Sequence, residues 1–97
     1  MSAYLIFIRN TTTDPEGLAT YVRKAGPTGE GHPHKVLAFH GAVEVLEGDP
    51  AEALVMVQFE DMARAKAWYE SPAYQDAKTH RLKSADYRVL LVEGLAG

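Results

Sequence analysis

The spacing of apolar residues along the chain predicts four β-strands. Residues 4–9 (YLIFIR) are β-branched or aromatic with apolar side chains on both alternating faces, which is typical of a strand. Similar patterns predict strands over residues 36–46, 54–59 and 86–94. Within the strand over 36–46, Gly41 is a weak point that allows a bulge. The turn EGDPAE is expected to join the second and third strands into a hairpin.

A helix is predicted between the first two strands. Its apolar residues recur at positions i, i+3, i+4 and i+7 and form one stripe: Leu18, Tyr21, Val22 and Ala25. Asp14 is a favourable N-cap, and Pro15 suits the first helical position. Gly26 and Pro27 end the helix, and the composition of residues 28–34 predicts a loop.

Two further helices, separated by a break at Ser71-Pro72, are predicted before the last strand. Asp61 is a favourable N-cap for the first of them. A residue before proline avoids the helical region, whereas serine is a good cap and proline a good first helical residue. Ser71 is therefore expected to end one helix and to cap a short third helix over residues 72–80.

The predicted order of elements is β-α-β-β-α-β, with the second helical region split in two. This order is typical of the ferredoxin-like fold, an α+β arrangement in which helices cover one face of a four-stranded antiparallel sheet. A chain of 97 residues is long enough for a single domain of this kind. We therefore expect one ferredoxin-like domain over residues 1–97.

Both faces of the predicted sheet are apolar. The first strand places Tyr4, Ile6 and Ile8 on one face and Leu5 and Phe7 on the other. An antiparallel sheet with one solvated face would alternate apolar and polar residues instead. Because two helices cannot cover both faces, we expect a homodimer in which the sheet of a second subunit covers the open face. The alternative is a monomer whose open face curls around a ligand.

Composition excludes several classes of function. The net charge is -3 with both signs mixed along the chain, and no basic stripe indicates a nucleic-acid partner. Cysteine is absent, so disulfides, a thiolate nucleophile and cysteine-based metal sites are excluded. The apolar run over residues 3–8 is too short for a signal peptide or a membrane span. A cytoplasmic location without a membrane partner is the default expectation.

The stretch QFEDMARAKAWYESPAYQDAKTHRLKSADYRVLLVEG, residues 58–94, resembles a bacterial family of unknown function, number 1330 of the domain-of-unknown-function series. The segment VLEG at 45–48 and the pair Tyr4 and Arg9 are also similar to it. The most specific features are Trp68-Tyr69, Ser71-Pro72, Tyr74-Gln75 and Arg81. The resemblance spans nearly the whole chain.

The resemblance implies the dimeric α/β-barrel superfamily, in which two ferredoxin-like sheets pack face to face. That superfamily includes cofactor-free monooxygenases acting on polyphenols, haem-degrading enzymes, muconolactone-type isomerases and amino-acid-sensing domains, and a fold alone does not choose among them. Members of the family often carry an arginine and two glycines in the second strand. Here Phe39 and His40 replace the arginine and the first glycine, so a role tied to that arginine does not carry over.

Candidate ligand-binding residues gather around the Ser71-Pro72 break. Trp68, Tyr69 and Tyr74 could line an aromatic pocket between helices and sheet, and Ser71 could offer a hydroxyl. Arg81 could bind a carboxylate or phenolate in a forked contact. The structural alternative is that the aromatic residues belong to the core, Ser71 only caps a helix, and Arg81 pairs with an acidic residue.

His40 is the candidate catalytic residue. It is expected in mid-strand, on one face with Val36, Ala38 and Ala42. A neutral imidazole suits abstraction of a proton from an acidic carbon or a phenol. The alternative is a histidine whose hydrogen bonds are satisfied at a dimer interface or the edge of a cleft.

No metal or nucleotide site is predicted. His32 and His34 have the i, i+2 spacing of two metal ligands, and His80 or a carboxylate would have to be the third. No recognisable motif supplies that third ligand. We therefore expect His32 and His34 to be solvated loop histidines. GPTGEG lacks the Lys-Ser/Thr of a phosphate-binding loop, and no G-x-S-x-G motif occurs. No cofactor is therefore expected.

Three hypotheses about function follow. The first is a homodimer that binds a small aromatic or acidic molecule, which Tyr74 and Arg81 orient. The second is a cofactor-independent monooxygenase or isomerase with His40 as base and Arg81 as anion stabiliser. The third is a structural or regulatory dimer without a ligand.

Overall fold

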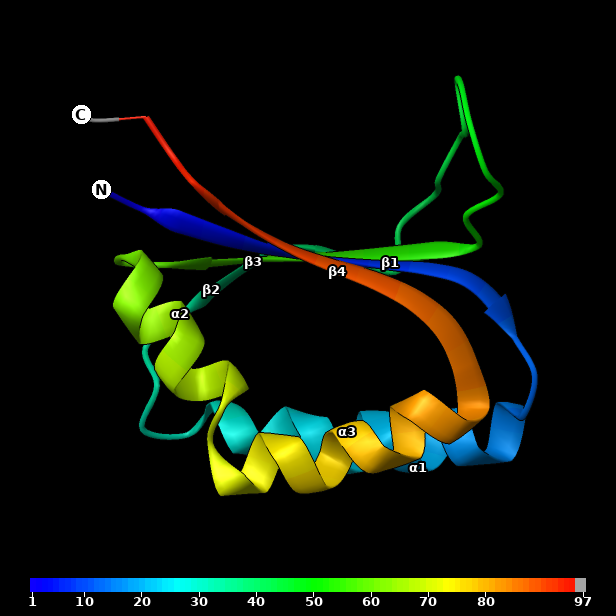
Figure 1. Ribbon diagram of the computed structural model, residues 1–97, viewed down its shortest axis with the longest axis horizontal. Coiled ribbons are helices and arrows are strands. Elements are labelled where there is room, and N and C mark those ends of the chain that lie inside the picture. Colours follow the sequence, from blue (N-terminus) through cyan, green and yellow to red (C-terminus); the bar gives the residue numbers. More distant parts are fainter. Residues whose placement is uncertain (96–97) are drawn as a thin grey trace.

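Four antiparallel strands form one sheet in the order β2-β3-β1-β4 (Figure 1). The computed structural model describes residues 1–95. The strands are β1 (Ala3–Thr12), β2 (Lys35–Phe39), β3 (Ala53–Phe59) and β4 (Ala85–Glu93). The first and last strands of the chain therefore lie side by side, as the ferredoxin-like arrangement requires.

The helices all lie on one side of this sheet (Figure 1). They are α1 (Pro15–Ala25), the short 3-10 helix η1 (Gly26–Gly29), α2 (Met62–Tyr69) and α3 (Pro72–Ser84). Helices α1 and α3 pack side by side beneath the strands, and α2 connects β3 to them. The predicted α+β fold, with its split second helical region, is confirmed.

Side-chain caps explain the break between α2 and α3. The carboxylate of Asp61 accepts a hydrogen bond from the backbone N–H of Arg64 at 2.8 Å. The Ser71 hydroxyl accepts from the backbone N–H of Tyr74 at 3.3 Å and donates to the carbonyl of Trp68 at 2.7 Å. Ser71 thus ends one helix and caps the next, as predicted. Asp14 occupies the N-cap position of α1, but its side chain makes no capping bond.

The predicted strand over residues 36–46 is wrong in its second half. Strand β2 ends at Phe39, and His40 follows with a φ of 53°, in the left-handed region. The last hydrogen bond joins the backbone N–H of His40 to the carbonyl of Leu54, and β3 begins one residue before Leu54. Beyond His40 the chain has no strand beside it to pair with, so residues 40–52 form a long loop on the side of the sheet away from the helices (Figure 1).

The irregularity expected at Gly41 lies earlier, between Val36 and Ala38. A strand normally turns alternate side chains to the same face. The shift in register instead places Val36 opposite Val57 and Phe39 opposite Val55. As a result, Val36 and Phe39 both face the helices, and Ala38 does not share a face with Val36 as predicted.

The core lies between the sheet and the helices. Its buried side chains come from β1, β3, α2 and α3: Ala3, Leu5, Phe7, Val57, Phe59, Ala65, Trp68 and Tyr74. Alternate residues of the strands face away from the helices and are less buried, such as Ile6 of β1, Met56 of β3 and Leu90 of β4. The opposite face of the sheet is therefore apolar and uncovered in a single chain.

Candidate functional site

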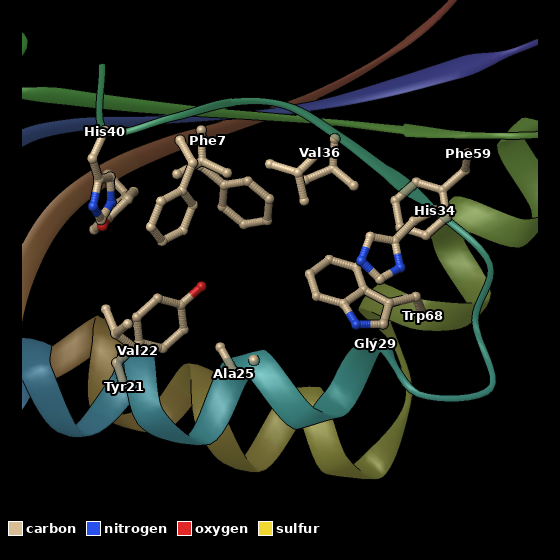
Figure 2. Close-up of a pocket in the computed structure, with 15 residues that line it drawn as sticks. Phe7, Tyr21, Val22, Ala25, Gly29, His34, Val36, His40, Phe59 and Trp68 are labelled. Carbon is tan, nitrogen blue, oxygen red and sulfur yellow. The ribbon is translucent and has the colours of Figure 1, made fainter. Parts of the chain in front are cut away.

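A cavity of about 240 Å³ separates the sheet from α1 (Figure 2). Its upper wall is formed by strands β1, β2 and β3, and its floor by α1 and η1. The wall is mainly aromatic and aliphatic, and it is lined by Phe7, Tyr21, Val22, Ala25, Gly26, Gly29, His34, Val36, Phe39, His40, Val55, Val57, Phe59, Trp68 and Tyr87. A mainly apolar cavity with a few convergent polar groups is typical of a small-molecule site.

Aromatic rings close one end of the cavity. Trp68 stacks on Phe59 with ring centroids 5.8 Å apart, and the His34 ring lies 6.0 Å from Phe59 (Figure 2). The indole N–H of Trp68 donates to the hydroxyl of Thr28 at 3.1 Å, and both residues are buried. This bond satisfies the polar atom of Trp68, so the indole presents an apolar face to the cavity.

His40 stands at the opposite end of the cavity (Figure 2). Its ring stacks on Phe39 with centroids 4.2 Å apart. Partial burial, with a smaller effect of the positive charge of Arg9, lowers the pKa of His40 below its ordinary value of 6.5. The imidazole is therefore neutral at pH 7 and able to accept a proton.

Tyr21 supplies a hydroxyl from the floor of the cavity, and Figure 2 shows it pointing inward. This hydroxyl lies 2.9 Å from the hydroxyl of Tyr74, which is fully buried behind it. Burial raises the pKa of both phenols. Both are therefore protonated near neutral pH, and the pair shares one hydrogen bond between two O–H groups.

Arg81 lies behind the cavity wall rather than in it. The residue is 4% exposed, and its guanidinium carbon lies 5.0 Å from the ring centre of Tyr87 and 5.9 Å from that of Tyr21. The buried Nε of Arg81 has no hydrogen-bond partner within the described chain. The ion pairs among residues 1–95 involve Arg9, Lys24 and Arg64 and leave Arg81 without a carboxylate.

The structure distributes the predicted ligand-binding residues over four places. Trp68 lines the cavity, whereas Tyr74 and Arg81 form a second layer behind Tyr21. Ser71 is engaged in the helix cap. Tyr69 is half-buried away from the cavity, with the Lys78 ammonium 5.2 Å from its ring centre. His40 and Arg81 therefore do not line one cavity together.

Sequence reasoning missed the residue that connects the two layers, Tyr21. The helical pattern placed it in an apolar stripe, and only its phenolic oxygen distinguished it from the aliphatic members of that stripe. His34, expected as a solvated loop residue, forms part of the cavity wall, although much of its side chain stays exposed. No group of three histidine, aspartate or glutamate side chains suited to a metal ion occurs within residues 1–95.

The family model for a domain of unknown function, DUF1330, matches residues 2–95. The chain belongs to the DUF1330 family. No functionally curated protein matches it. None of the described helices is both long enough and apolar enough to cross a membrane.

Solved structures of similar fold extend the comparison. A protein of unknown function from Rhodopseudomonas palustris has a TM-score of 0.74 at 20% identity, covering 99% of this chain and 84% of that one. A dimeric ferredoxin-like protein of unknown function from Jannaschia sp. CCS1 has a TM-score of 0.66 at 18% identity, covering 97% and 100%. SnoaB, a cofactor-independent oxygenase from Streptomyces nogalater, has a TM-score of 0.60 at 9% identity, covering 99% and 93%. These similarities show the fold.

Proposed function

We propose that this protein is a homodimer that binds a small aromatic molecule in the cavity between its sheet and α1. The observation that carries the proposal is the cavity wall. Rings of Phe7, Phe59, Trp68 and Tyr87 surround a space of about 240 Å³, and the polar groups that face or border it include the Tyr21 hydroxyl and two imidazoles. Such a wall favours a flat, apolar ligand with at least one polar substituent.

The uncovered face of the sheet supports the homodimer. Leu90 and Val92 of β4 are 47% and 48% exposed there, and Ile6 lies directly between Met56 of β3 and Leu90 of β4. Contiguous apolar patches of this kind usually mark interaction sites. A second copy fits because the solved structure of this fold from Jannaschia sp. CCS1 is described as dimeric.

The loop over residues 40–52 adds a second argument for a partner on this face. It rises on the uncovered side of the sheet (Figure 1) and exposes 44% of Val45 and 88% of Leu46. Both side chains lack apolar cover in the single chain. A subunit seated on the open face would lie beside this loop and could bury them.

Filling the cavity tests the binding proposal. Ala25 lines the cavity, whereas Ala19 lies on the exposed side of the same helix. We expect Ala25→Leu to weaken binding of naphthol at least about tenfold by calorimetry, because the added methyl groups occupy the ligand's space. Ala19→Leu, which makes the same chemical change on the same helix, should leave the affinity unchanged. Equal affinities in all three proteins would contradict binding in this cavity.

A second candidate function is a cofactor-independent oxygenase. His40 at the cavity end favours it, because a neutral imidazole could remove a proton from an acidic phenol or carbon and leave an electron-rich anion for dioxygen to oxidise. The fold similarity to SnoaB is consistent with this chemistry. The isomerase alternative would use the same base without oxygen.

Oxygen consumption with polyphenol substrates tests this candidate. We expect His40→Ala to abolish turnover and leave the dimer intact. The wild-type kcat/KM should fall on acidification with an apparent pKa below 6.5, because only neutral His40 can act as the base. A rate that is unchanged by the substitution would exclude His40 as the base. A dimer that binds no aromatic molecule and turns over no substrate would favour the structural role.

A further inference from the structure

We propose that the cavity selects an anionic aromatic ligand, a carboxylate or an ionised phenol, whose charged oxygen is bound by the Tyr21 hydroxyl and stabilised by the Arg81 guanidinium behind it. This inference rests on the proposed function, since it names the chemical class of the ligand. It makes Tyr21 a binding residue, and it makes Tyr74 and Arg81 positioning residues that act through Tyr21.

The first observation is an uncompensated buried charge. Arg81 carries a guanidinium, is 4% exposed and has no carboxylate partner among residues 1–95. A buried charge is costly unless it is paired, and its Nε–H also lacks a partner within that range. The rings of Tyr21 and Tyr87 compensate only in part, because contact with a ring face is weaker than an ion pair. An anion close to these rings would supply the missing negative charge.

The second observation is where that anion can lie. Tyr21 and Tyr87 both line the cavity, and Arg81 packs against both. The guanidinium therefore lies next to two residues of the cavity wall. The residues that line the cavity include no aspartate or glutamate, so no acidic side chain opposes an incoming anion.

The third observation is the pair of hydroxyls. Burial raises the pKa of the Tyr74 phenol. The positive charge of nearby Arg81 acts in the opposite direction and lowers it. A positive charge attracts the lone pairs of the Tyr74 oxygen and turns its O–H away, toward Tyr21. The two oxygens lie 2.9 Å apart and either can donate; in the proposed arrangement Tyr74 donates to Tyr21, which leaves the Tyr21 proton free to point into the cavity. A donor prepared in this way favours an anionic oxygen over a neutral one.

A purely structural role for Arg81 makes a different prediction. If the guanidinium only packs against Tyr21 and Tyr87, substitutions at Arg81 or Tyr21 will change stability and the affinity for all aromatic ligands alike. If it selects an anion, they will change the ratio of affinities for charged and neutral ligands. This ratio is insensitive to a general loosening of the cavity.

The experiment compares naphthoate with naphthamide, which have the same rings and differ in the charge of one polar group. Calorimetry gives the two dissociation constants for the wild type at neutral pH. We expect the wild type to prefer naphthoate by about tenfold or more, the usual value of a hydrogen bond to a charged group. Tyr21→Phe keeps the ring but removes the donor, and it should reduce the preference to less than about threefold.

Arg81→Gln should reduce the preference in the same way, and Arg81→Lys should retain part of it because the charge remains. If Arg81→Gln does not fold, Tyr21→Phe decides alone. Tyr69→Phe is the matched control, because Tyr69 does not line the cavity and its hydroxyl makes no hydrogen bond within residues 1–95. It should leave both dissociation constants unchanged.

The two proposals fail in distinguishable ways. If the wild type binds neither compound, the proposed function is overturned, and the selection of an anion fails with it. If the wild type binds both compounds equally well, the cavity is a ligand site but the selection of an anion is overturned. A preference that survives Tyr21→Phe would also overturn the role given to Tyr21.

Discussion

The two faces of the sheet carry similar side chains but have different surroundings. On the helix face, Leu5 and Phe7 are 3% and 4% exposed because the helices cover them. On the other face, Ile6 is only half-buried and Leu90 is 47% exposed, although these residues are as apolar as their neighbours. Polarity alone therefore does not distinguish the two faces, and the position of the helices decides which one becomes the core.

In the proposed function, the two faces of the sheet also have different roles. The helix face contains the cavity, because α1 stands off from the sheet and aromatic side chains line the space between them without filling it. The open face is a broad apolar surface without helices and suits a second subunit. We therefore assign ligand binding to the covered face and association to the uncovered one.

The largest effect is expected from a truncation on the covered face. Phe7 makes edge contacts with Trp68 and Tyr74, with ring centroids 6.1 and 6.4 Å apart. Phe7→Ala should lower the free energy of unfolding by about 3–5 kcal/mol, the usual cost of removing a buried phenylalanine. Denaturant unfolding at a fixed protein concentration measures it. A loss below about 1 kcal/mol would show that this face is not the core.

A charge at the centre of the open face should act on association instead. Ile6 lies between Met56 and Leu90 on that face, so Ile6→Glu would bury a carboxylate in the subunit interface. We expect the dimer dissociation constant to rise at least about a hundredfold, measured by sedimentation. Leu82→Lys, on the outer surface of α3 at 64% exposure, is the control and should leave the dimer intact. A dimer that tolerates Ile6→Glu would place the interface elsewhere.

The smallest effects are expected at the helix caps that hold the covering layer. Ser71 makes two hydrogen bonds at the start of α3, so Ser71→Ala should lower the free energy of unfolding by about 1 kcal/mol. Asp14 holds the corresponding position on α1 without a side-chain capping bond, and Asp14→Ala should cost less. Thermal unfolding of the two variants shows which substitution lowers stability more. The reverse order would show that the Asp14 carboxylate stabilises α1 by its charge.

Local sequence signals were enough to predict the helices that cover the sheet. Proline at the first position of a helix and a capping side chain before it are short-range features, so Asp61 and Ser71-Pro72 marked the helix starts correctly. The end of β2 was not predictable in this way. It depends on where β3 begins, which is a property of a distant segment, and the apolar residues 42–46 continue the strand pattern without a strand to pair with.

The site was predictable only in part for the same reason. Trp68 was recognisable as an aromatic residue near a helix break, and it does line the cavity. Tyr21, Tyr74 and Arg81 are up to 60 positions apart in the sequence, and they come into contact because α1 packs against α3. No spacing within one segment encodes such a contact. The sequence therefore indicated the types of side chain involved but not which of them share a wall.

The most direct test of the account is a methyl NMR titration of the protein with naphthoate. Ligand rings shift the resonances of methyl groups that they contact, so the experiment reports which face of the sheet binds. We predict shifts for Val36, Val55 and Val57, which line the cavity, and none for Ile6, Met56 and Leu90 on the open face. Shifts confined to the open-face residues would contradict the assignment of ligand binding to the covered face.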